Sequence, residues 1–261
     1  MQQYDFMKKK AILMHGMAAC LLTLTACSRH YQLASVERTR ILIDQRYDAT
    51  ADVDAAKWME AYKPKVDSMM SPRVGKTAKY LAAYRPESEL SNLLTDILMW
   101  GGKAFHEQPD FAVYNMGGIR AAFAQGDVSV GDVIEVAPFE NKICFLTLKG
   151  EQVLELFSQM ALNDGEGVSH GVQLVISKDH RLLSAKLHGK DIDPAADYRI
   201  ATLDYLAQGN DGMVAFKKAT NILSPTSEEN NIRFIIMNYF REKMAGGQAV
   251  DAVKEGRVII K

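Results

Sequence analysis

Residues 110–120 read DFAVYNMGGIR and join an apolar run to a turn of small residues that ends in an arginine. The apolar residues between Asp110 and Tyr114 indicate a short strand. Asn115 and the glycine pair after it are typical of a tight turn, because these residues tolerate backbone angles that others avoid. We therefore expect a strand that runs into a turn, with further strands and helices packed around it.

Apolar residues at helical spacing occur on both sides of this unit. In residues 89–105 the leucines and isoleucine between Leu90 and Leu98 fall on one side of a helix. The other helices are expected over residues 52–70, with a break or kink near Pro64, and over residues 131–136, 150–160 and 230–244.

Shorter β-branched and apolar runs predict the strands. They are expected over residues 40–44, 142–148, 172–177, 182–187, 198–203 and 258–260, with the third and fourth forming a hairpin and the last closing an edge. Residues 74–84 fit a strand or a loop, and residues 163–171 form a Gly-rich loop. Strands and helices mix without a strict βαβ period or repeats, so the fold class is α+β or a layered α/β domain.

The first residues have the pattern of an export signal. Lys8–Lys10 precede an apolar run over residues 11–24, which is too short for a comfortable membrane span. The stretch that ends at Cys27 resembles a bacterial lipobox, which predicts a lipoprotein signal peptide over residues 1–26, lipidation at Cys27 and a polar tether over residues 27–38. The alternatives are a plain signal peptide or a buried apolar helix. We expect an exported protein in the outer membrane, facing the periplasm or exposed at the surface, with the lipid as its only membrane contact.

Charge and cysteine content exclude several classes of protein. The formal net charge of −1 gives no sign of a surface for a nucleic acid polymer. Three cysteines are present, of which Cys20 leaves with the signal and Cys27 takes the lipid. Only Cys144 remains, so neither an intrachain disulfide nor a cysteine-rich metal site is expected.

Two patterns that would indicate catalysis are incomplete in this sequence. Residues 167–171, GVSHG, match the nucleophile elbow of α/β-hydrolases, but that elbow needs a strand before the serine and a helix after it, and a polar loop and a β-branched run occur here. The histidines lack the spacing of a two-metal phosphoesterase, which needs roughly six or more His, Asp and Asn ligands. We therefore expect no catalytic residue, metal site or bound cofactor on this chain. The histidines after the signal are His30, His106, His170, His180 and His188.

Three segments together carry a family resemblance. Residues 85–96 read RPESELSNLLTD, residues 115–141 contain NMGGIR, GDV and PFEN in that order, and residues 198–212 read YRIATLDYLAQGNDG. In order and spacing they resemble the C-terminal domain of 5'-nucleotidases, UDP-sugar hydrolases and cyclic-nucleotide phosphodiesterases. Ser91, Met116 and Asn210 each stand where the family has glycine.

The resemblance implies both an architecture and a division of labour. It implies a layered α/β/β/α domain of the 5'-nucleotidase C-terminal type over residues 39–261. In that family this domain holds the nucleoside, while a separate N-terminal domain binds two divalent metal ions and cleaves the phosphate. Only the signal and the tether precede the matched region here. We therefore expect the dimetal centre on a partner domain and no hydrolysis by this chain alone.

Aromatic residues in two of the segments suit a nucleobase. The resemblance makes Phe139 and Tyr205 the two sides of a clamp around the flat base, and stacking on such rings contributes roughly 1–3 kcal/mol per base. The alternative is that both rings belong to the hydrophobic core. Asn141 is expected to bond the edge of the base.

Polar residues in the same segments suit the ribose and phosphate. Asp211 can accept hydrogen bonds from both ribose hydroxyls, although an N-D-G sequence is also a common turn. Arg120 offers a guanidinium fork to ribose oxygens or phosphate, and Arg85 is expected to be a second such contact. Asn115 either holds its turn or faces a neighbouring domain, and Gly118 of that turn is assigned to the same site.

Three functions remain open at this stage. The chain is expected to be the nucleotide-binding part of a 5'-nucleotidase-type system in nucleotide catabolism, working with a separate dimetal phosphoesterase chain. The alternative is a nucleoside-binding lipoprotein that feeds a transporter or sensor. The third is a scaffold that has lost its ligand, against which the intact site residues argue. Binding in the micromolar to millimolar range, roughly −4 to −8 kcal/mol, is expected.

Overall fold

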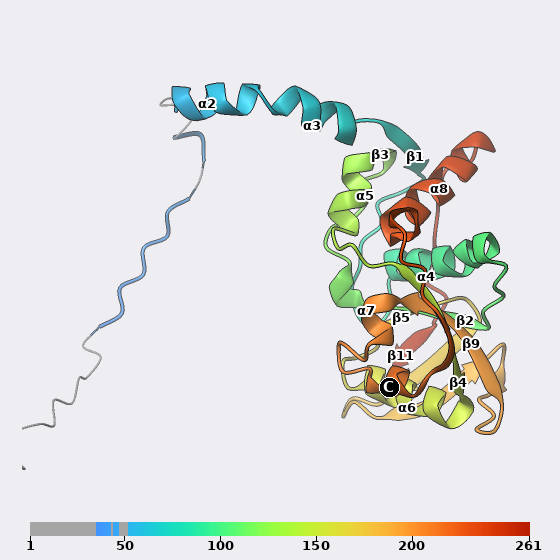
Figure 1. Ribbon diagram of the computed structural model, residues 1–261. Coiled ribbons are helices and arrows are strands. Elements are labelled where there is room, and N and C mark those ends of the chain that lie inside the picture. Colours follow the sequence, from blue (N-terminus) through green and yellow to red (C-terminus); the bar gives the residue numbers. More distant parts are fainter. Residues whose placement is uncertain (1–34, 43, 47–51) are drawn as a thin grey trace, which may run out of the picture. The chain divides into compact units, whose positions relative to one another are not determined.

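The computed structural model describes residues 35–42, 44–46 and 52–261 (Figure 1). The expected signal peptide and the lipidation site Cys27 lie outside these residues. The chain divides into two compact units, residues 1–56 and 57–261. Residues 40–42 are irregular, so this part of the strand expected over residues 40–44 is wrong, and Ile43 is not described. The side chains of Ile41 and Leu42 are exposed, so no packing holds this segment against a neighbouring strand among the described residues. Without such a neighbour, the backbone groups of a strand have no partner in the protein.

The helix expected over residues 52–70 is broken, as Pro64 predicted. The two parts are α2 (Val53–Glu60) and α3 (Lys63–Met70). Pro64 occupies the first turn of α3, where its missing N–H costs nothing because the first N–H groups of a helix have no partner within it.

Three β-sheets make up the strand content of the described residues. A two-stranded sheet pairs β1 (Arg73–Thr77) with β3 (Gly126–Ser129). The five-stranded sheet has the order β10 (Thr220–Leu223), β4 (Ile143–Lys149), β9 (Asp197–Leu203), β2 (Phe111–Tyr114) and β5 (Gly167–Val168). The four-stranded sheet has the order β11 (Val258–Ile260), β6 (Val172–Ile176), β7 (Leu182–Leu187) and β8 (Lys190–Asp191).

The longer helices cover these sheets. They are α4 (Glu89–Gly101), α5 (Val130–Val136), α6 (Gly150–Ala161), α7 (Asp204–Ala207) and α8 (Ile232–Ala245). Short 3₁₀ turns follow at η2 (Gly102–Phe105), η3 (Met116–Gly118), η4 (Val214–Lys218) and η5 (Glu228–Asn230). α4 contacts β2, β5 and α8, while α6 contacts β4 and β9 of the larger sheet and β7 of the smaller one. The mixed α+β class expected from the sequence is confirmed.

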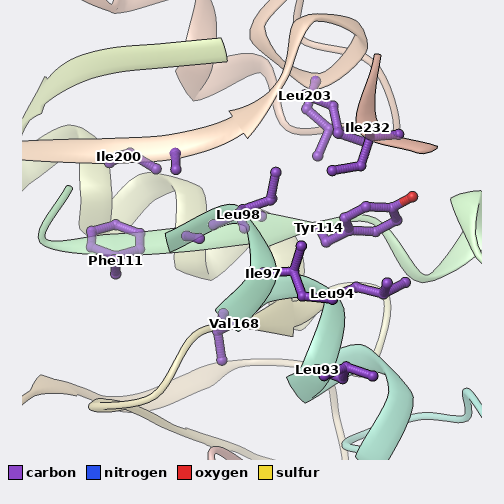
Figure 2. Packing of buried hydrophobic residues seen from close by; sticks show 14 of the residues in the cluster. Leu93, Leu94, Ile97, Leu98, Phe111, Tyr114, Val168, Ile200, Leu203 and Ile232 are labelled. Carbon is purple, nitrogen blue, oxygen red and sulfur yellow. The ribbon is translucent and has the colours of Figure 1, made fainter. Parts of the chain in front are cut away.

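The core forms where α4 packs against the middle of the five-stranded sheet. Figure 2 shows Leu94, Ile97 and Leu98 of α4 beside Tyr114 of β2, and all four residues of β2 are buried. β2 reads as a continuous apolar run because it lies between β9 and β5 and is covered on both faces. Each buried leucine or isoleucine contributes about 1.5–3 kcal/mol to folding.

The register of three strands brings distant residues to one edge of this sheet. β2 and β9 are parallel, with Ala112 opposite Ala201, so both strands end at the same edge. β4 is antiparallel to β9, with Ile143 opposite Leu203, and therefore begins at that edge. The segments that follow β2 and β9 and the segment that precedes β4 meet there, and they carry the candidate site.

Candidate functional site

A cavity of about 200 Å³ lies where these segments meet. Residues from the turn after β2, the loop before β4 and the segment after β9 line it. The lining residues are Asn115, Gly117, Phe139, Asn141, Tyr205 and Asp211. Five of the six are residues that the sequence assigned to a binding site, and the register of the sheet explains why residues so far apart in the chain converge.

The two aromatic rings reach the cavity from different elements. Phe139 follows Pro138, whose carbonyl accepts a hydrogen bond of 2.9 Å from Arg233 of α8, and its side chain is 47% exposed. Phe139 is therefore not a core residue. Tyr205 on α7 is half-buried and packs against the core with one part of its ring. The clamp remains a prediction, but both rings line a single cavity.

The segment around Tyr205 is fixed to the sheet by backbone contacts. The carboxylate of Asp204 accepts a hydrogen bond of 3.0 Å from the backbone N–H of Lys142, just before β4. Asn210 donates to the carbonyl of Tyr205 over 2.7 Å. Asn210 stands where the family has glycine, so this chain uses the added amide to close the loop that follows α7.

Asp211 adopts an unusual backbone conformation that directs its carboxylate to the cavity. Its φ of 54° lies in the left-handed region, between Gly209 at 81° and Gly212 at 77°. One carboxylate oxygen accepts from the Tyr205 hydroxyl over 2.7 Å, and the other accepts from the Asn115 amide over 2.6 Å. The hydrogen bond from Tyr205 to this carboxylate, with some burial and the nearby charge, raises the pKa of Tyr205.

Asn115 is the most buried polar residue of the lining, at 4% exposure. It precedes η3 with extended backbone angles, but its side chain does not cap that turn and instead bonds Asp211. Its amide oxygen is buried and has no hydrogen-bond partner among the described residues. A Cβ at Gly118 would lie 2.7 Å from this oxygen. Gly118 is therefore not part of the lining but leaves room for the Asn115 side chain.

Asn141 lines the cavity, whereas Arg120 lies outside the lining, next to Gly117. The exposed Arg120 donates a hydrogen bond of 3.2 Å to the carbonyl of Gly117, which keeps its guanidinium beside a lining residue. The backbone carbonyl of Asn141 accepts from Ile232 at the start of α8, over 2.9 Å, so its side chain is held at the cavity. Contact of either side chain with a ligand remains a prediction.

Arg85 lies outside the lining, and its partner is a residue that the sequence analysis missed. Its guanidinium pairs with Glu166 over 2.7 Å and also donates to the carbonyl of Gly165. The other carboxylate oxygen of Glu166 accepts from the backbone N–H of Met116 over 2.5 Å. Burial raises the pKa of Glu166, while Arg85 and the Met116 hydrogen bond oppose that rise. A charged residue inside the Gly-rich loop was the only sequence signal.

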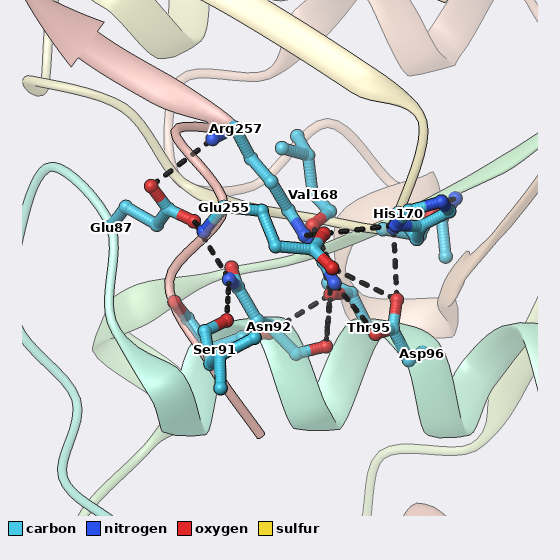
Figure 3. A network of polar contacts seen from close by, with 12 residues as sticks. Glu87, Ser91, Asn92, Thr95, Asp96, Val168, His170, Glu255 and Arg257 are labelled. Carbon is cyan, nitrogen blue, oxygen red and sulfur yellow. Dashed lines mark hydrogen bonds and ion pairs between the residues drawn. The ribbon is translucent and has the colours of Figure 1, made fainter. Parts of the chain in front are cut away.

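The rest of the first family segment holds the C-terminal part of the chain (Figure 3). Glu87 accepts from the backbone N–H groups of Glu255 and Arg257 and from the Asn92 amide. Arg257, at 4% exposure, pairs with both oxygens of Asp96 and with Glu255. These motif residues are structural, because their hydrogen-bonding groups point into the protein.

The rejected catalytic motif also has a structural role. Ser169 is buried, and its hydroxyl oxygen accepts a hydrogen bond of 2.8 Å from the backbone N–H of Ala112 in β2. Strands β5 and β6 flank it, so it does not lie on a strand–helix elbow. Within residues 35–42, 44–46 and 52–261 no group of three His, Cys, Asp or Glu side chains is arranged to hold a metal ion. In the same residues no helix has the length and apolar character to cross a membrane.

The fold is an α+β domain with a cavity at the edge of its central sheet. Residues 73–218 match the family described as the 5'-nucleotidase C-terminal domain, and the chain belongs to that family. The family resemblance is thereby confirmed, and the three segments that suggested it all lie within the matched residues.

Similar proteins are considerably longer than this chain. Protein UshA of Escherichia coli K12 is 28% identical over 157 residues, which are 59% of this chain and 28% of UshA. The trifunctional nucleotide phosphoesterase protein YfkN of Bacillus subtilis is 26% identical over 225 residues, which are 78% of this chain and 15% of YfkN. The crystal structure of a 5'-nucleotidase precursor from Thermus thermophilus superposes with a TM-score of 0.69 at 25% identity, covering 80% of this chain and 43% of that one.

Proposed function

We propose that this chain binds the nucleoside part of a nucleotide in the cavity at the sheet edge. It then serves as the substrate-recognition part of a nucleotide-degrading system whose dimetal phosphoesterase is on a separate chain. The observation that carries the proposal is the convergence of two aromatic rings and one carboxylate on a single cavity, from segments more than 60 residues apart in the sequence.

The rings supply the affinity for the base. Phe139 exposes almost half of its surface and lines the cavity, so its ring is accessible to a ligand. A base that stacks on Phe139 and Tyr205 gains roughly 1–3 kcal/mol from each ring, whatever its hydrogen-bonding pattern. Asn141, which lines the same cavity, adds contacts to the edge of the base.

The polar side of the cavity suits a ribose. Each oxygen of Asp211 accepts one hydrogen bond from the protein and keeps a further lone pair for a ligand hydroxyl. The Asn115 amide, which donates to Asp211, holds this carboxylate at the cavity. The exposed guanidinium of Arg120 is available to a phosphate.

The chemical step is assigned to another chain. The described residues do not provide the ligand set of a two-metal centre, so no hydrolytic step is assigned to them. The family relation to nucleotide phosphoesterases supports a role in nucleotide breakdown. The purified domain is therefore expected to release no phosphate from AMP with Mn²⁺, Co²⁺ or Zn²⁺, and to gain activity only with a dimetal phosphoesterase from the same cell.

The place of action remains part of the proposal. Lys8–Lys10, the apolar run and Cys27 support export and lipid anchoring, in the outer membrane. Fractionation of cells that express Cys27→Ser tests this, because loss of the acylated thiol releases the protein from the membrane fraction. A variant that stays with the membranes would exclude the lipid as the anchor.

Calorimetric titration of the domain tests ligand binding. We expect saturable binding of adenosine and AMP with a dissociation constant in the micromolar to millimolar range, about −4 to −8 kcal/mol. Nucleosides with other bases test the breadth of recognition, and ribose alone serves as a control without a base. Absence of saturable binding for every nucleoside and nucleotide up to about 10 mM would refute the proposed function.

A further inference from the structure

We propose that Glu166 is a positioning residue of the nucleoside site. It binds the N-terminal end of the turn η3 from another loop and so leaves the Asn115 side chain to hold Asp211. This inference rests on the proposed function, because it matters for binding only if Asp211 receives the ligand.

The turn η3 lacks a capping hydrogen bond from the residue in front of it, Asn115. The first N–H groups of a helical turn have no partner within the turn, and an asparagine in front of it ordinarily supplies one with its own side chain. Asn115 has the extended backbone of such a cap, with φ −76° and ψ 131°, yet its side chain makes no capping bond. Instead it donates to Asp211 over 2.6 Å.

Glu166 satisfies one of these N–H groups from another loop. Its carboxylate lies 2.5 Å from the backbone nitrogen of Met116, the first residue of η3. A negative charge at this end of a turn interacts favourably with the exposed N–H groups. The first N–H group of the turn is thus satisfied from outside, and the adjacent Asn115 side chain bonds the cavity carboxylate and not the turn.

The Arg85 guanidinium keeps Glu166 in this position. Glu166 is 2% exposed, and burying a lone carboxylate would cost several kcal/mol. Arg85 pairs with it over 2.7 Å and also bonds the carbonyl of Gly165 next to it. The pair therefore locks the Gly-rich loop to the turn that lines the cavity, which explains why Arg85 is useful to the site although it does not line it.

The competing explanation is an ion pair that only stabilises the fold. Arg199 and Glu107 provide the matched example, since they also pair over 2.7 Å and are mostly buried. Arg199 lies near the start of β9, whereas the cavity lies beyond its end. Glu107→Ala is therefore the control for loss of an ion pair away from the cavity.

A double-mutant cycle between Glu166 and Asn115, read by adenosine titration, separates the two explanations. Glu166→Ala and Asn115→Ala are each expected to weaken adenosine binding about fivefold to tenfold. If Glu166 acts through Asn115, the double variant binds no more than about twofold worse than either single variant. Glu166→Gln keeps an acceptor for Met116 and is expected to lose less than about threefold. Glu107→Ala is expected to lower the melting temperature without changing affinity.

Two further measurements keep the proposal testable. If Glu166→Ala does not fold, Arg85→Met with Glu166→Leu removes the cap without leaving a buried charge unpaired, and it replaces Glu166→Ala in the cycle. The side-chain amide signal of Asn115, identified in two-dimensional NMR by its loss in Asn115→Ala, is expected to shift in the Glu166 variant without any ligand. An unchanged signal, or losses of affinity that multiply in the double variant, would overturn the inference. Absence of adenosine binding by the wild-type protein would refute the proposed function instead, and the amide signal would still decide the role of Glu166.

Discussion

Two polar networks grow from the same stretch of sequence, residues 85–96, and they differ in how completely they are satisfied. In the network of Figure 3, Arg257 gives its donors to Asp96, to Glu255 and to the carbonyl of Val168, so every nitrogen of its guanidinium is paired within the protein. In the network at the sheet edge, Asp211 is exposed and keeps spare acceptor capacity, and the buried oxygen of Asn115 has no partner among the described residues. Complete internal pairing fits a structural role, and unfilled hydrogen-bonding capacity beside aromatic rings fits the proposed binding role.

The sharpest test of this contrast is Arg257→Leu. Removing the buried guanidinium takes its ion-pair partner from Asp96 and one of two partners from Glu255. Both carboxylates are partly exposed, so the free energy of unfolding is expected to fall by about 3 kcal/mol, from two charge-assisted contacts of about 1.5 kcal/mol each. Adenosine affinity of the protein that remains folded is expected to stay at the wild-type value. Urea unfolding and titration at a temperature well below the melting point provide the two readouts.

The control for this substitution is Arg181→Leu, which removes an exposed pair with Asp179. An exposed pair contributes about 0–1 kcal/mol, so its loss is small. If Arg257→Leu costs no more than this control, or weakens adenosine binding while the fold stays intact, the separation between the two networks fails.

The aromatic rings provide the next largest effect. For Phe139 the effect is expected mainly on nucleoside affinity and much less on stability. Phe139→Ala is expected to weaken nucleoside binding about tenfold, from roughly 1–3 kcal/mol of stacking. Because the ring is 47% exposed, the accompanying loss of stability is expected to stay near the average of about 1 kcal/mol for a point substitution, well below the roughly 3–5 kcal/mol of a core phenylalanine. Tyr205→Ala is expected to weaken binding similarly and to cost more stability, because its ring packs against the core. Titration and thermal unfolding measured together provide the test.

Tyr80→Ala serves as the control for the aromatic substitutions. Its ring is 65% exposed and does not line the cavity, so neither affinity nor melting temperature is expected to change noticeably. If Phe139→Ala and Tyr205→Ala unfold the domain but leave binding intact in the folded fraction, both rings belong to the core and the clamp is wrong.

A smaller effect is expected on the choice between sugars. Asp211→Asn exchanges a charged acceptor for an amide, and a hydrogen bond to a charged group contributes about 1.5–3 kcal/mol against about 1 kcal/mol for a neutral one. Adenosine binding is expected to weaken about fivefold to tenfold, and 2'-deoxyadenosine binding by a smaller factor, because it has one hydroxyl fewer to lose. Equal losses for the two ligands would mean that Asp211 does not face the ribose. Parallel titrations of the two nucleosides with both proteins measure this.

The smallest expected effect is the pH dependence of two arginine–glutamate pairs. The hydrogen bonds from Arg199 lower the pKa of Glu107 below its ordinary 4.5, so this pair stabilises the fold above that pH and its contribution is lost as the pH falls through the lowered pKa. Burial raises the pKa of Glu166 above 4.5, so its contribution is fully present below that value and is lost as the pH rises through the raised pKa. A rise in pH therefore increases the stabilisation by Glu107 and decreases the stabilisation by Glu166.

Urea unfolding across about pH 3 to 7 separates the two carboxylates. Relative to Glu107→Gln, the wild-type protein is expected to gain stability as the pH rises toward 4.5, and relative to Glu166→Gln it is expected to lose stability as the pH rises above 4.5. If both differences change with pH in the same direction, the pKa of Glu166 is not raised in the folded protein.

The sequence predicted the elements whose signal is local. α4 and α6 have long apolar faces, and β4 and β9 are apolar runs with polar boundaries, so each was found within about two residues of its bounds, apart from the end of α4, which continues as η2. The edge strands β3 and β10 were missed, and β5 fell inside the expected Gly-rich loop. These strands are two to four residues long and exist because a neighbour pairs with them, which periodicity cannot reveal.

For the site, the sequence predicted which residues line the cavity but not which distant residues support them. The family pattern placed five residues at the cavity correctly, because the pattern itself reflects their convergence. It did not reveal that Arg85 pairs with a residue 81 positions away, or that Gly118 serves Asn115 instead of lining the cavity. Which partner a charge selects depends on the packing of the whole domain, and Glu166 has no signature of its own.

The network around Arg257 also affects when the domain can fold during its synthesis. Glu87 and Asp96 emerge from the ribosome more than 160 residues before the segment that satisfies them, and the parallel partner of β6 is β11, near the end of the described residues. Until that segment arrives, a buried carboxylate and one edge of the four-stranded sheet lack their partners. We therefore expect a nascent or truncated chain that ends before Val253 to stay incompletely folded and open to proteases.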